Sequence, residues 1–414
     1  MELVRINTAG SVDDGKSTLI GRFLYDHNAL TLEQEDLIHK KTKEKGLQDL
    51  DFSVITDGLI AEREQGITID VAHIYFSSKS RKFIIADSPG HVEYTRNMVT
   101  GASNSELSVI LIDARKGLLE QTHRHYYISR LLKLESVVFC INKMDLVDYS
   151  EDVFLEIASS INKMVNLLPE IEQNIFIVPI SSLKGDNVVF ASNNMPWYVG
   201  ETLSSVLHNF NPKKHLHNDF RLDVQQVFHV QNKEFVDFRS YAGTIISGEI
   251  NVGDLVTVLP VNKQSEIIEI RSFVDSLSTA SQGEAIQIRL KDDIDISRGD
   301  IFVKKIDTHL FNKDVQAKIV WLDERGANLS TKYILQAGTR TSVCKILNVD
   351  YLINPINPLE SKQATEIKLN EIAKVKLKLA NPVYLDSYDS NKVNGAFILI
   401  DPITNNTAAI GFVE

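Results

Sequence analysis

Near its start the chain reads Gly10-Ser11-Val12-Asp13-Asp14-Gly15-Lys16-Ser17-Thr18, between an apolar run at 3–7 and a helical pattern at 19–24. A strand, a loop of this glycine spacing and a helix together predict a phosphate-binding P-loop. The glycines let backbone N–H groups surround the β-phosphate, and the helix N-terminus adds its dipole. We expect Lys16 to reach the β- and γ-phosphate oxygens and the Ser17 hydroxyl to ligate Mg²⁺. The motifs that follow disfavour the alternative, a glycine-rich turn without a ligand.

A second loop follows the apolar run at 83–86 and reads Asp87-Ser88-Pro89-Gly90-His91. A carboxylate at the end of a buried strand can hold Mg²⁺ through a water molecule, and we expect this of Asp87. We expect the Gly90 N–H to point to the γ-phosphate. The position of the loop would then depend on whether a γ-phosphate is present, as in a nucleotide switch.

Two further residues are candidates for the control of hydrolysis. Thr68 lies between the phosphate loops, and we expect its hydroxyl to close over Mg²⁺ in the triphosphate state. The alternative is that Thr68 only begins a strand at 69–74. His91 is expected to orient the attacking water, although a lone histidine is more often a surface residue. With Lys16 they form the predicted catalytic set, because phosphoryl transfer needs positioning and charge neutralisation.

Two motifs indicate which base is bound. Asn142-Lys143-Met144-Asp145 follows an apolar run at 137–141, and Ser181-Ser182-Leu183 follows another at 175–180. The Asp145 carboxylate can accept hydrogen bonds from guanine N1–H and the exocyclic amine, a donor pair that adenine lacks. We expect Asn142 to hold the loop and the guanine edge, the Lys143 stem to pack along the base, and the second motif to supply an N–H to guanine O6. The pair of motifs favours GTP over ATP.

The order of the patterns predicts an α/β P-loop GTPase domain followed by two all-β barrel domains. In the first part apolar runs alternate with helical patterns, which is typical of βαβ units around a parallel sheet. The runs at 71–76 and 82–86 predict a hairpin. Beyond Pro212 the strands are short, β-branched and separated by Gly-Asp and Asn-Pro turns. We expect a nucleotide domain at 1–213 and barrels at 214–306 and 307–414.

Composition excludes some classes of protein. Lys plus Arg is 44 against 55 for Asp plus Glu, and the net charge of −11 argues against a large nucleic-acid-binding surface. No apolar run approaches the roughly 18 residues of a membrane helix, and there is no signal-peptide pattern. Cys140 lies in a predicted buried strand, far in sequence from Cys344. We therefore expect a cytoplasmic protein without disulfides or a membrane segment.

Two groups of lysines have simpler explanations than ligand binding. A helical pattern with interspersed acids contains Lys40, Lys41, Lys43 and Lys45, which predicts a solvated face. A second group alternates with apolar residues at Lys374, Lys376 and Lys378. This alternation predicts a half-exposed strand whose lysines protect a sheet edge. The eleven histidines show no metal-ligand spacing.

The residues around the motifs narrow the family. The segments that carry the resemblance are Asp13-Asp14 in the P-loop, 57–59, 62–70, 94–103, 113–117, 142–150, 240–243, 296–300, 369–373 and 395–401. Over nearly its whole length the chain resembles the GTPase (large) subunit of heterodimeric bacterial sulfate adenylyltransferase, in the translation-factor GTPase superfamily. It departs from the family pattern at Ala9, where Cys is common, and at Ser88, where Thr is usual. Both changes are small and should preserve the loops.

The resemblance implies a subunit that hydrolyses GTP and couples this to the formation of adenosine 5′-phosphosulfate and pyrophosphate from ATP and sulfate. It also implies GTP and Mg²⁺ as cofactors and a small-subunit partner that carries the adenylyl-transfer site, in a complex that binds ATP and sulfate. Since no second P-loop motif is present, we expect no adenylylsulfate kinase activity. The alternatives with the same architecture are a translation factor that delivers a charged tRNA and a regulatory GTPase without a metabolic role.

Overall fold

The computed structural model describes residues 3–44, 46–47, 49–55, 72–78, 81–88, 95–168, 172–213, 219–230, 238–304, 311–358 and 360–414. It contains two compact units, Met1–Lys213 with Asn354–Glu360, and Lys214–Ile353 with Ser361–Glu414. The predicted limit between the two barrels, at 306 and 307, falls outside the described ranges and stays a prediction.

The first unit is built on a six-stranded sheet with the order β2-β3-β1-β4-β5-β6. Its strands are β1 (Leu3–Ala9), β2 (Ala72–Ser77), β3 (Lys82–Asp87), β4 (Leu107–Asp113), β5 (Ser136–Asn142) and β6 (Asn174–Pro179). The predicted hairpin is confirmed, since β2 and β3 pair antiparallel. All other neighbours pair parallel, so the carboxyl ends of β1, β3, β4, β5 and β6 meet at one edge. From β1 the sheet grows in two directions, to β3 on one side and to β4 on the other. Ligands bind at such switch points in α/β sheets.

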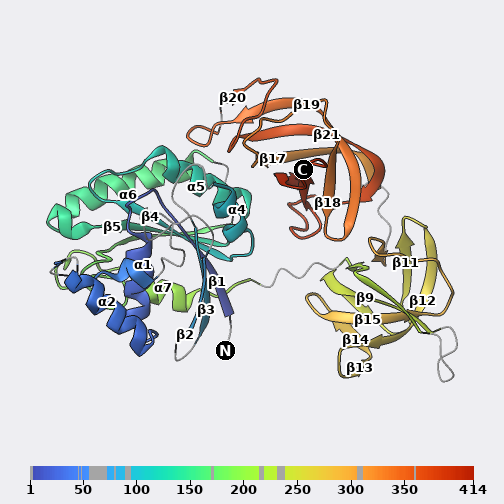
Figure 1. The fold of residues 1–414 in the computed structure, drawn as a ribbon, viewed down its shortest axis with the longest axis horizontal. Helices are drawn as coiled ribbons and strands as arrows, with labels where there is room; N and C mark the ends of the chain where they lie inside the picture. The colour runs from blue at the N-terminus through green and yellow to red at the C-terminus, as the bar shows by residue number, and fades with distance from the viewer. Residues whose placement is uncertain are drawn as a thin grey trace. The chain divides into compact units, whose positions relative to one another are not determined.

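Helices cover both faces of this sheet, which explains why β4 and β5 are buried at every position. In Figure 1, α4 (Thr95–Ser103), α5 (Glu120–Leu131) and α6 (Glu151–Asn166) lie on one side, and α1 (Lys16–Asp26) and α7 (Leu203–Asn209) lie on the other. The unit also contains α2 (Leu32–Glu44) and the 3-10 turns η1 (Phe52–Ile55) and η3 (Met144–Val147). In the described part of the chain, no helix has both the length and the apolar character to cross a membrane.

The second unit contains two closed barrels. The ring of barrel 2 is β11-β16-β7-β9-β15-β12, closed by the pairing of β11 with β12. Its strands and those attached to them are β7 (Arg221–Asp223), β8 (Gln226–Val230), β9 (Phe238–Ser247), β10 (Glu249–Asn251), β11 (Leu255–Leu259), β12 (Lys263–Arg271), β13 (Ser276–Leu277), β14 (Thr279–Ser281), β15 (Ala285–Leu290) and β16 (Ile301–Val303). Alternate residues of the ring fill one apolar core.

The ring of barrel 3 is β18-β22-β23-β17-β21-β19, closed by the pairing of β18 with β19. Its strands are β17 (Phe311–Trp321), β18 (Tyr333–Ala337), β19 (Arg340–Ile353), β20 (Ser361–Lys362), β21 (Ile372–Tyr384), β22 (Ala396–Ile400) and β23 (Thr407–Val413). With the α/β sheet of the first unit, these rings confirm the predicted fold class. Cys140 and Cys344 are both buried and free, which confirms the expectation of a chain without disulfides.

The predicted edge-protecting role of Lys374, Lys376 and Lys378 is wrong. Their strand, β21, pairs with β17 on one side and with β19 on the other, so it is an interior strand of the barrel. The alternation of polar and apolar residues is the same for an edge strand and an interior strand with one solvated face, and it could not separate the two. Lys378 instead forms an ion pair with Asp314 at 2.8 Å.

Two buried ion pairs cross the seam between the barrels. Arg340 Nε of barrel 3 lies 3.3 Å from Asp223 Oδ1 of barrel 2, and Arg221 Nη2 of barrel 2 lies 3.4 Å from Asp386 Oδ1 of barrel 3. All four side chains are at most 8% exposed. Asn394 links the two pairs, because its Oδ1 accepts from Arg340 Nη2 at 2.5 Å and its Nδ2 donates to Asp386 Oδ2 at 2.6 Å. A hydrogen-bonded network of charges therefore holds the barrels together.

Candidate nucleotide-binding site

The P-loop connects β1 to α1 in a conformation that its glycines permit. Asp13 and Gly15 have φ values of +67° and +94°, in the left-handed region. A Cβ at residue 15 would lie 2.5 Å from Asn142 Nδ2, so a side chain there would be both strained and obstructed. Gly15 is also the N-cap of α1, where Lys16, Ser17 and Thr18 form the first turn. The loop therefore places backbone N–H groups at a helix N-terminus, a favourable anion site.

The Lys16 ammonium lies inside the loop. Its Nζ donates to the carbonyl oxygens of Gly10 at 2.9 Å and Ser11 at 3.1 Å. Burial lowers the pKa of Lys16, and the carboxylates of Asp87 and Asp14 oppose this shift. A buried cation surrounded by carbonyl groups and amide N–H groups can bind several phosphate oxygens at short range.

Asp14 supports the loop from below. Its side chain is 1% exposed, and its Oδ2 accepts from the Ser11 backbone N–H at 2.6 Å. Burial raises the pKa of Asp14, while the Ser11 N–H lowers it. Asp14 is thus buried and holds the loop through the Ser11 N–H. Asp13 is exposed, and Ser11 and Val12 are half-buried.

The carboxyl end of β3 lies beside the P-loop strand. Asp87 is fully buried, and its Oδ1 accepts from Thr8 Oγ1 at 2.9 Å. Ser88 Oγ donates to Asn7 Oδ1 at 2.6 Å. These contacts fix the start of the predicted second phosphate loop. Its remaining members, Pro89, Gly90 and His91, lie outside the described residues, as does Thr68.

Asn142, at the end of β5, joins three loops through one buried amide. Its Nδ2 donates to the Asp14 carbonyl at 2.7 Å, and its Oδ1 accepts from the Ser182 backbone N–H and hydroxyl, each at 2.9 Å. The amide oxygen of Asn142 and one of its two N–H groups are therefore used within the protein. The predicted role in holding the loop therefore has a direct geometric basis.

Lys143 connects the base loop to the phosphate loop. Its φ of +65° is left-handed, and its Nζ donates to the Asp13 carbonyl and to Asp113 Oδ2, the latter at 2.9 Å. Asp113, fully buried at the end of β4, also accepts from the Arg115 guanidinium at 2.7 and 3.0 Å. Burial opposes the ionisation of Asp113, but the hydrogen bonds from Arg115 and Lys143 outweigh it and lower its pKa.

Asp113 is a site residue that the sequence reasoning missed. The signal was present, because Asp113 ends an apolar strand just as Asp87 does. Parallel strands bring such ends to the same edge of a sheet, so the position alone indicated a place near the nucleotide loops.

Asp145 and Ser181 lie together at the other end of the base loop. Ser181 Oγ donates to Asp145 Oδ1 at 2.6 Å and accepts from the Lys184 backbone N–H at 3.1 Å. Among the described residues, Asp145 Oδ2 forms no hydrogen bond. Met144 is fully buried and belongs to the core, and the Leu183 carbonyl accepts from Arg22 Nη1 at 3.2 Å. Of the predicted base-loop residues, Asp145 is thus the one with a carboxylate oxygen to spare.

A fully buried histidine lies beneath the phosphate loop. His125, on α5, is 0% exposed, and among the described residues neither ring nitrogen has a hydrogen-bond partner of normal geometry. Burial, followed by the charges of Lys16 and Arg124, lowers the pKa of His125 to about 3. The ring is therefore neutral in the folded chain at any pH near neutrality.

This burial predicts a pH dependence of stability. The unfolded chain binds a proton at His125 below about pH 6.5, while the folded chain does so only near its lowered pKa, so stability falls as the pH drops below 6.5. We expect His125→Phe to reduce the difference in unfolding free energy between pH 7 and pH 5 by about 2 kcal/mol. Urea unfolding at both pH values measures this, with His39→Asn on the exposed face of α2 as the control. An unchanged difference would show that His125 is protonated in the folded chain.

The chain matches family models over most of its length. Residues 1–249 match the elongation factor Tu GTP binding domain, and residues 314–414 match the GTP-eEF1A C-terminal domain-like family. Sulfate adenylyltransferase subunit 1 of Aliarcobacter butzleri is 45% identical over 420 residues, which cover 100% of this chain and 87% of the relative. The corresponding subunit of Psychromonas ingrahamii is 43% identical over 415 residues, again covering 100% and 87%.

The chain belongs to the sulfate adenylyltransferase subunit 1 family. This confirms the resemblance that the motifs predicted. As a member of the subunit 1 family it is an enzyme subunit with a GTPase domain. The family name also implies at least one other subunit.

Among solved structures, the bacterial selenocysteine-specific elongation factor EF-Sec is similar at 19% identity and a TM-score of 0.45, covering 100% of this subunit 1 chain and 58% of that chain.

Proposed function

We propose that the chain is the GTP-hydrolysing subunit of sulfate adenylyltransferase. The observation that carries this proposal is the connection of the phosphate and base loops through Asn142 and Lys143, in a chain related to subunit 1 over its whole length. GTP hydrolysis drives ATP and sulfate to adenosine 5′-phosphosulfate and pyrophosphate. The reaction is the first step of sulfate activation, and we place it in the cytoplasm.

The phosphate loops bind the triphosphate. The N–H groups at the start of α1 and the Lys16 ammonium neutralise its charge, and Gly90 contacts the γ-phosphate. The conformation of the phosphate loop is set by its other members, Gly10, Ser11, Val12, Asp13, Asp14, Gly15 and Thr18. The Ser88 hydroxyl, bonded to Asn7 at 2.6 Å, and Pro89 hold the start of the second loop.

Guanine is recognised at the ends of β5 and β6. Asp145 accepts from N1–H and the exocyclic amine, and the hydrogen bond from Ser181 at 2.6 Å fixes the carboxylate orientation. The Lys143 stem packs along the base, since its ammonium is anchored at Asp113. An N–H of the Ser181–Ser182–Leu183 loop contacts guanine O6, and Met144 packs beneath the base loop.

The oxygen ligands at the site suit Mg²⁺, which prefers hard oxygen donors and keeps several waters. Ser17, Asp87 and Thr68 would hold it. Asp87 is held by Thr8 at 2.9 Å and interacts with Lys16, so its carboxylate is fixed near the phosphates. The ion would offset charge on the phosphate oxygens. For hydrolysis, His91 orients the attacking water, and the Thr68 hydroxyl closes over the ion site only in the triphosphate state.

A small subunit is the proposed partner, and it carries the site where ATP and sulfate react. The experiment measures GTP hydrolysis, pyrophosphate and adenosine 5′-phosphosulfate with the chain alone, the small subunit alone and both together. We expect both products to accumulate only when both subunits and GTP are present. Lys16→Ala should abolish product formation, whereas Lys163→Ala, exposed on α6, should not.

GTP turnover that is indifferent to ATP, sulfate and the small subunit would contradict the proposal and favour a regulatory GTPase. Salt-sensitive binding of aminoacyl-tRNA would favour a translation factor, because phosphate contacts weaken steeply with salt. Unchanged GTP hydrolysis by Lys16→Ala would contradict the P-loop assignment itself.

A further inference from the structure

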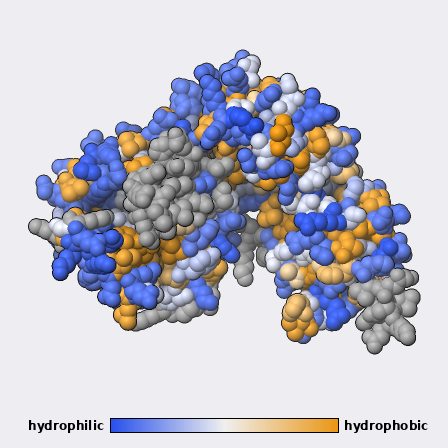
Figure 2. Space-filling model, viewed as in Figure 1, coloured by the Kyte–Doolittle hydropathy of each residue, from blue (hydrophilic) through white to orange (hydrophobic). Residues whose placement is uncertain are grey.

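On the face shown in Figure 2, hydrophobic residues form separate small areas within a mainly hydrophilic surface. Such areas are normal for a soluble chain. A more specific feature is a cavity of about 770 Å³ at the seam between barrels 2 and 3. It lies within the second unit and includes no residue of the proposed nucleotide site.

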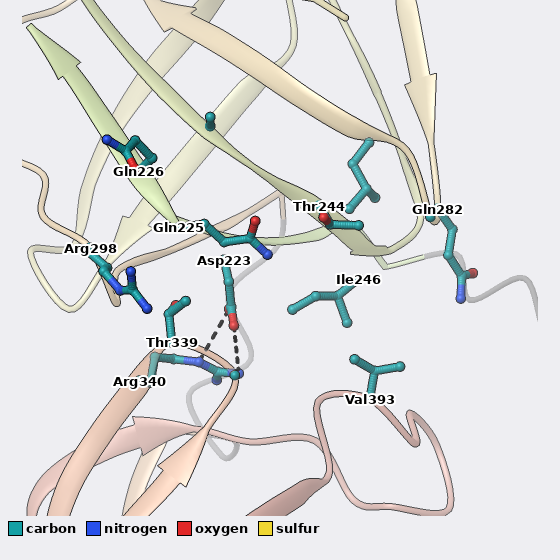
Figure 3. Close-up of a pocket in the computed structure, with 14 residues that line it drawn as sticks. Asp223, Gln225, Gln226, Thr244, Ile246, Gln282, Arg298, Thr339, Arg340 and Val393 are labelled. Atoms are coloured by element: carbon teal, nitrogen blue, oxygen red, sulfur yellow. Dashed lines mark hydrogen bonds and ion pairs between the residues drawn. The ribbon is translucent and has the colours of Figure 1, made fainter. Parts of the chain in front are cut away.

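Several polar groups of this cavity have no partner among the residues that the structure describes. Thr339 Oγ1 and Gln282 Oε1 are buried and form no hydrogen bond there. Within the described ranges, the Arg298 guanidinium has neither an ion pair nor a hydrogen bond. Figure 3 shows Arg298 and Gln282 on opposite sides, with Thr339 and Gln225 between them. A buried polar group without a partner is costly, so a ligand that pairs with Thr339 Oγ1 and Gln282 Oε1 gains free energy. The Arg298 side chain is exposed, so its charge is open to a ligand.

The charge of the cavity favours an anion. Asp223 lines it but is paired with Arg340 at 3.3 Å, as the dashed lines in Figure 3 show. Burial raises the pKa of Asp223, and the Arg340 guanidinium and the Thr339 backbone N–H oppose that shift. The two charges of the pair cancel, so the uncompensated charge is the cation of Arg298.

The same lining disfavours a nucleotide. The residues that line the cavity include no aromatic side chain to stack on a base, and Arg298 is a single uncompensated cation where a polyphosphate requires several. The amides of Gln225 and Gln282 can instead pair with peptide N–H and C=O groups, and Ile246 and Val393 provide apolar walls. The volume is in the range of pockets that bury a small ligand or a short segment.

We propose that this cavity binds an acidic peptide segment of the partner small subunit. Its Asp or Glu carboxylate pairs with Arg298 and the Thr339 hydroxyl, and its backbone pairs with Gln225 and Gln282. The inference rests on the proposed function, which supplies the partner.

The first test is binding of the small subunit to Arg298→Gln, measured by calorimetry at constant ionic strength. Arg298 is exposed in the free chain, and the bound segment would bury its charge against a carboxylate, so we expect the Kd to rise about 10-fold to 100-fold. Thr339→Val should weaken binding less, and GTP affinity should be unchanged in both. Arg271→Gln is the matched control, because Arg271 is an exposed arginine of barrel 2 that does not line the cavity. An unchanged Kd for Arg298→Gln overturns the inference.

The second test measures occupancy directly. Cys140 and Cys344 are buried, and burial raises the pKa of the Cys344 thiol to about 12, so both react slowly with iodoacetamide. In Gln225→Cys the new thiol lines the cavity, and we expect its alkylation to slow at least about 10-fold when the small subunit is added. Phe273→Cys, at a fully exposed hairpin position, should keep its rate.

The outcomes separate the two proposals. If the native chain forms no complex with the small subunit, the proposed function fails, and the inference fails with it. If the complex forms but residue 225 is alkylated at the rate of the free chain, the inference alone is overturned. Protection of residue 225 by free glutamate without the small subunit would assign the cavity to a small carboxylate and also overturn the peptide assignment.

Discussion

Asp145→Asn is expected to reverse the base preference, with GTP affinity falling at least about 100-fold and XTP becoming the preferred nucleotide. The proposed contacts are two hydrogen bonds from guanine to one carboxylate, each worth roughly 1.5–3 kcal/mol. An amide keeps one acceptor and gains an N–H donor, which suits the second carbonyl oxygen of xanthine. Ser181 can still donate to the amide oxygen at the position where it now meets Asp145 Oδ1 at 2.6 Å.

Competition of GTP and XTP with a fluorescent guanine nucleotide measures the change. Asp148→Asn is the control, because Asp148 is exposed, follows η3 and has a φ of +52° that Asn tolerates well. It should leave the preference for GTP intact. A GTP-over-XTP preference retained in Asp145→Asn would refute the base-reading role.

Asp223→Ala is expected to destabilise the second unit by about 3–5 kcal/mol, because it leaves Arg340 buried without its counter-charge. Arg340 is 6% exposed, and burial lowers its pKa despite the opposing charges of Asp223 and Asp386. A Cβ at residue 338 would clash with Asp223 Oδ2, so the Gly338 backbone, with a φ of +57°, lies close against this carboxylate. Thermal unfolding of the whole chain followed by calorimetry measures the loss in the transition of the barrels.

Two comparisons make this result specific. The double variant Asp223→Ala, Arg340→Leu should recover much of the loss, since removing both charges costs less than removing one. Asp293→Ala breaks an exposed ion pair with Arg239 and should change stability by less than about 1 kcal/mol. A loss in Asp223→Ala as small as in Asp293→Ala would mean that the seam network does not hold the barrels together.

The arrangement of the first unit was largely predictable, and the reason is topological. Motifs that follow successive parallel strands must meet at one edge, so Lys16, Asp87, Asn142 and Ser181 could be grouped without coordinates. What each side chain contacts was not predictable. Asn142 was expected to hold the loop and the guanine edge, and the pattern did not reveal that its amide bonds to the Asp14 carbonyl and to Ser182; its contact with the base stays a prediction.

The barrel region was predictable in class but not in detail. Asp223 and Arg340 are 117 positions apart, and no periodicity relates them. The edge role predicted for the lysines of β21 was wrong for a different reason. The alternation of lysines with apolar residues fits an edge strand and an interior strand equally well. Contacts between single side chains far apart in the sequence are thus the part of the barrel structure that local sequence patterns do not predict.

The single amide of Asn142 has a consequence for how a bound nucleotide leaves. The same side chain bonds to the backbone of Asp14 and to that of Ser182. Movement of the base loop therefore weakens the hydrogen bond that holds the phosphate loop. Departure would then be an all-or-none event with one rate-limiting opening. A partner surface that displaces the loop at one end of the nucleotide would therefore loosen the loop at the other end as well. Such a partner could set the rate of nucleotide exchange without contacting the phosphates.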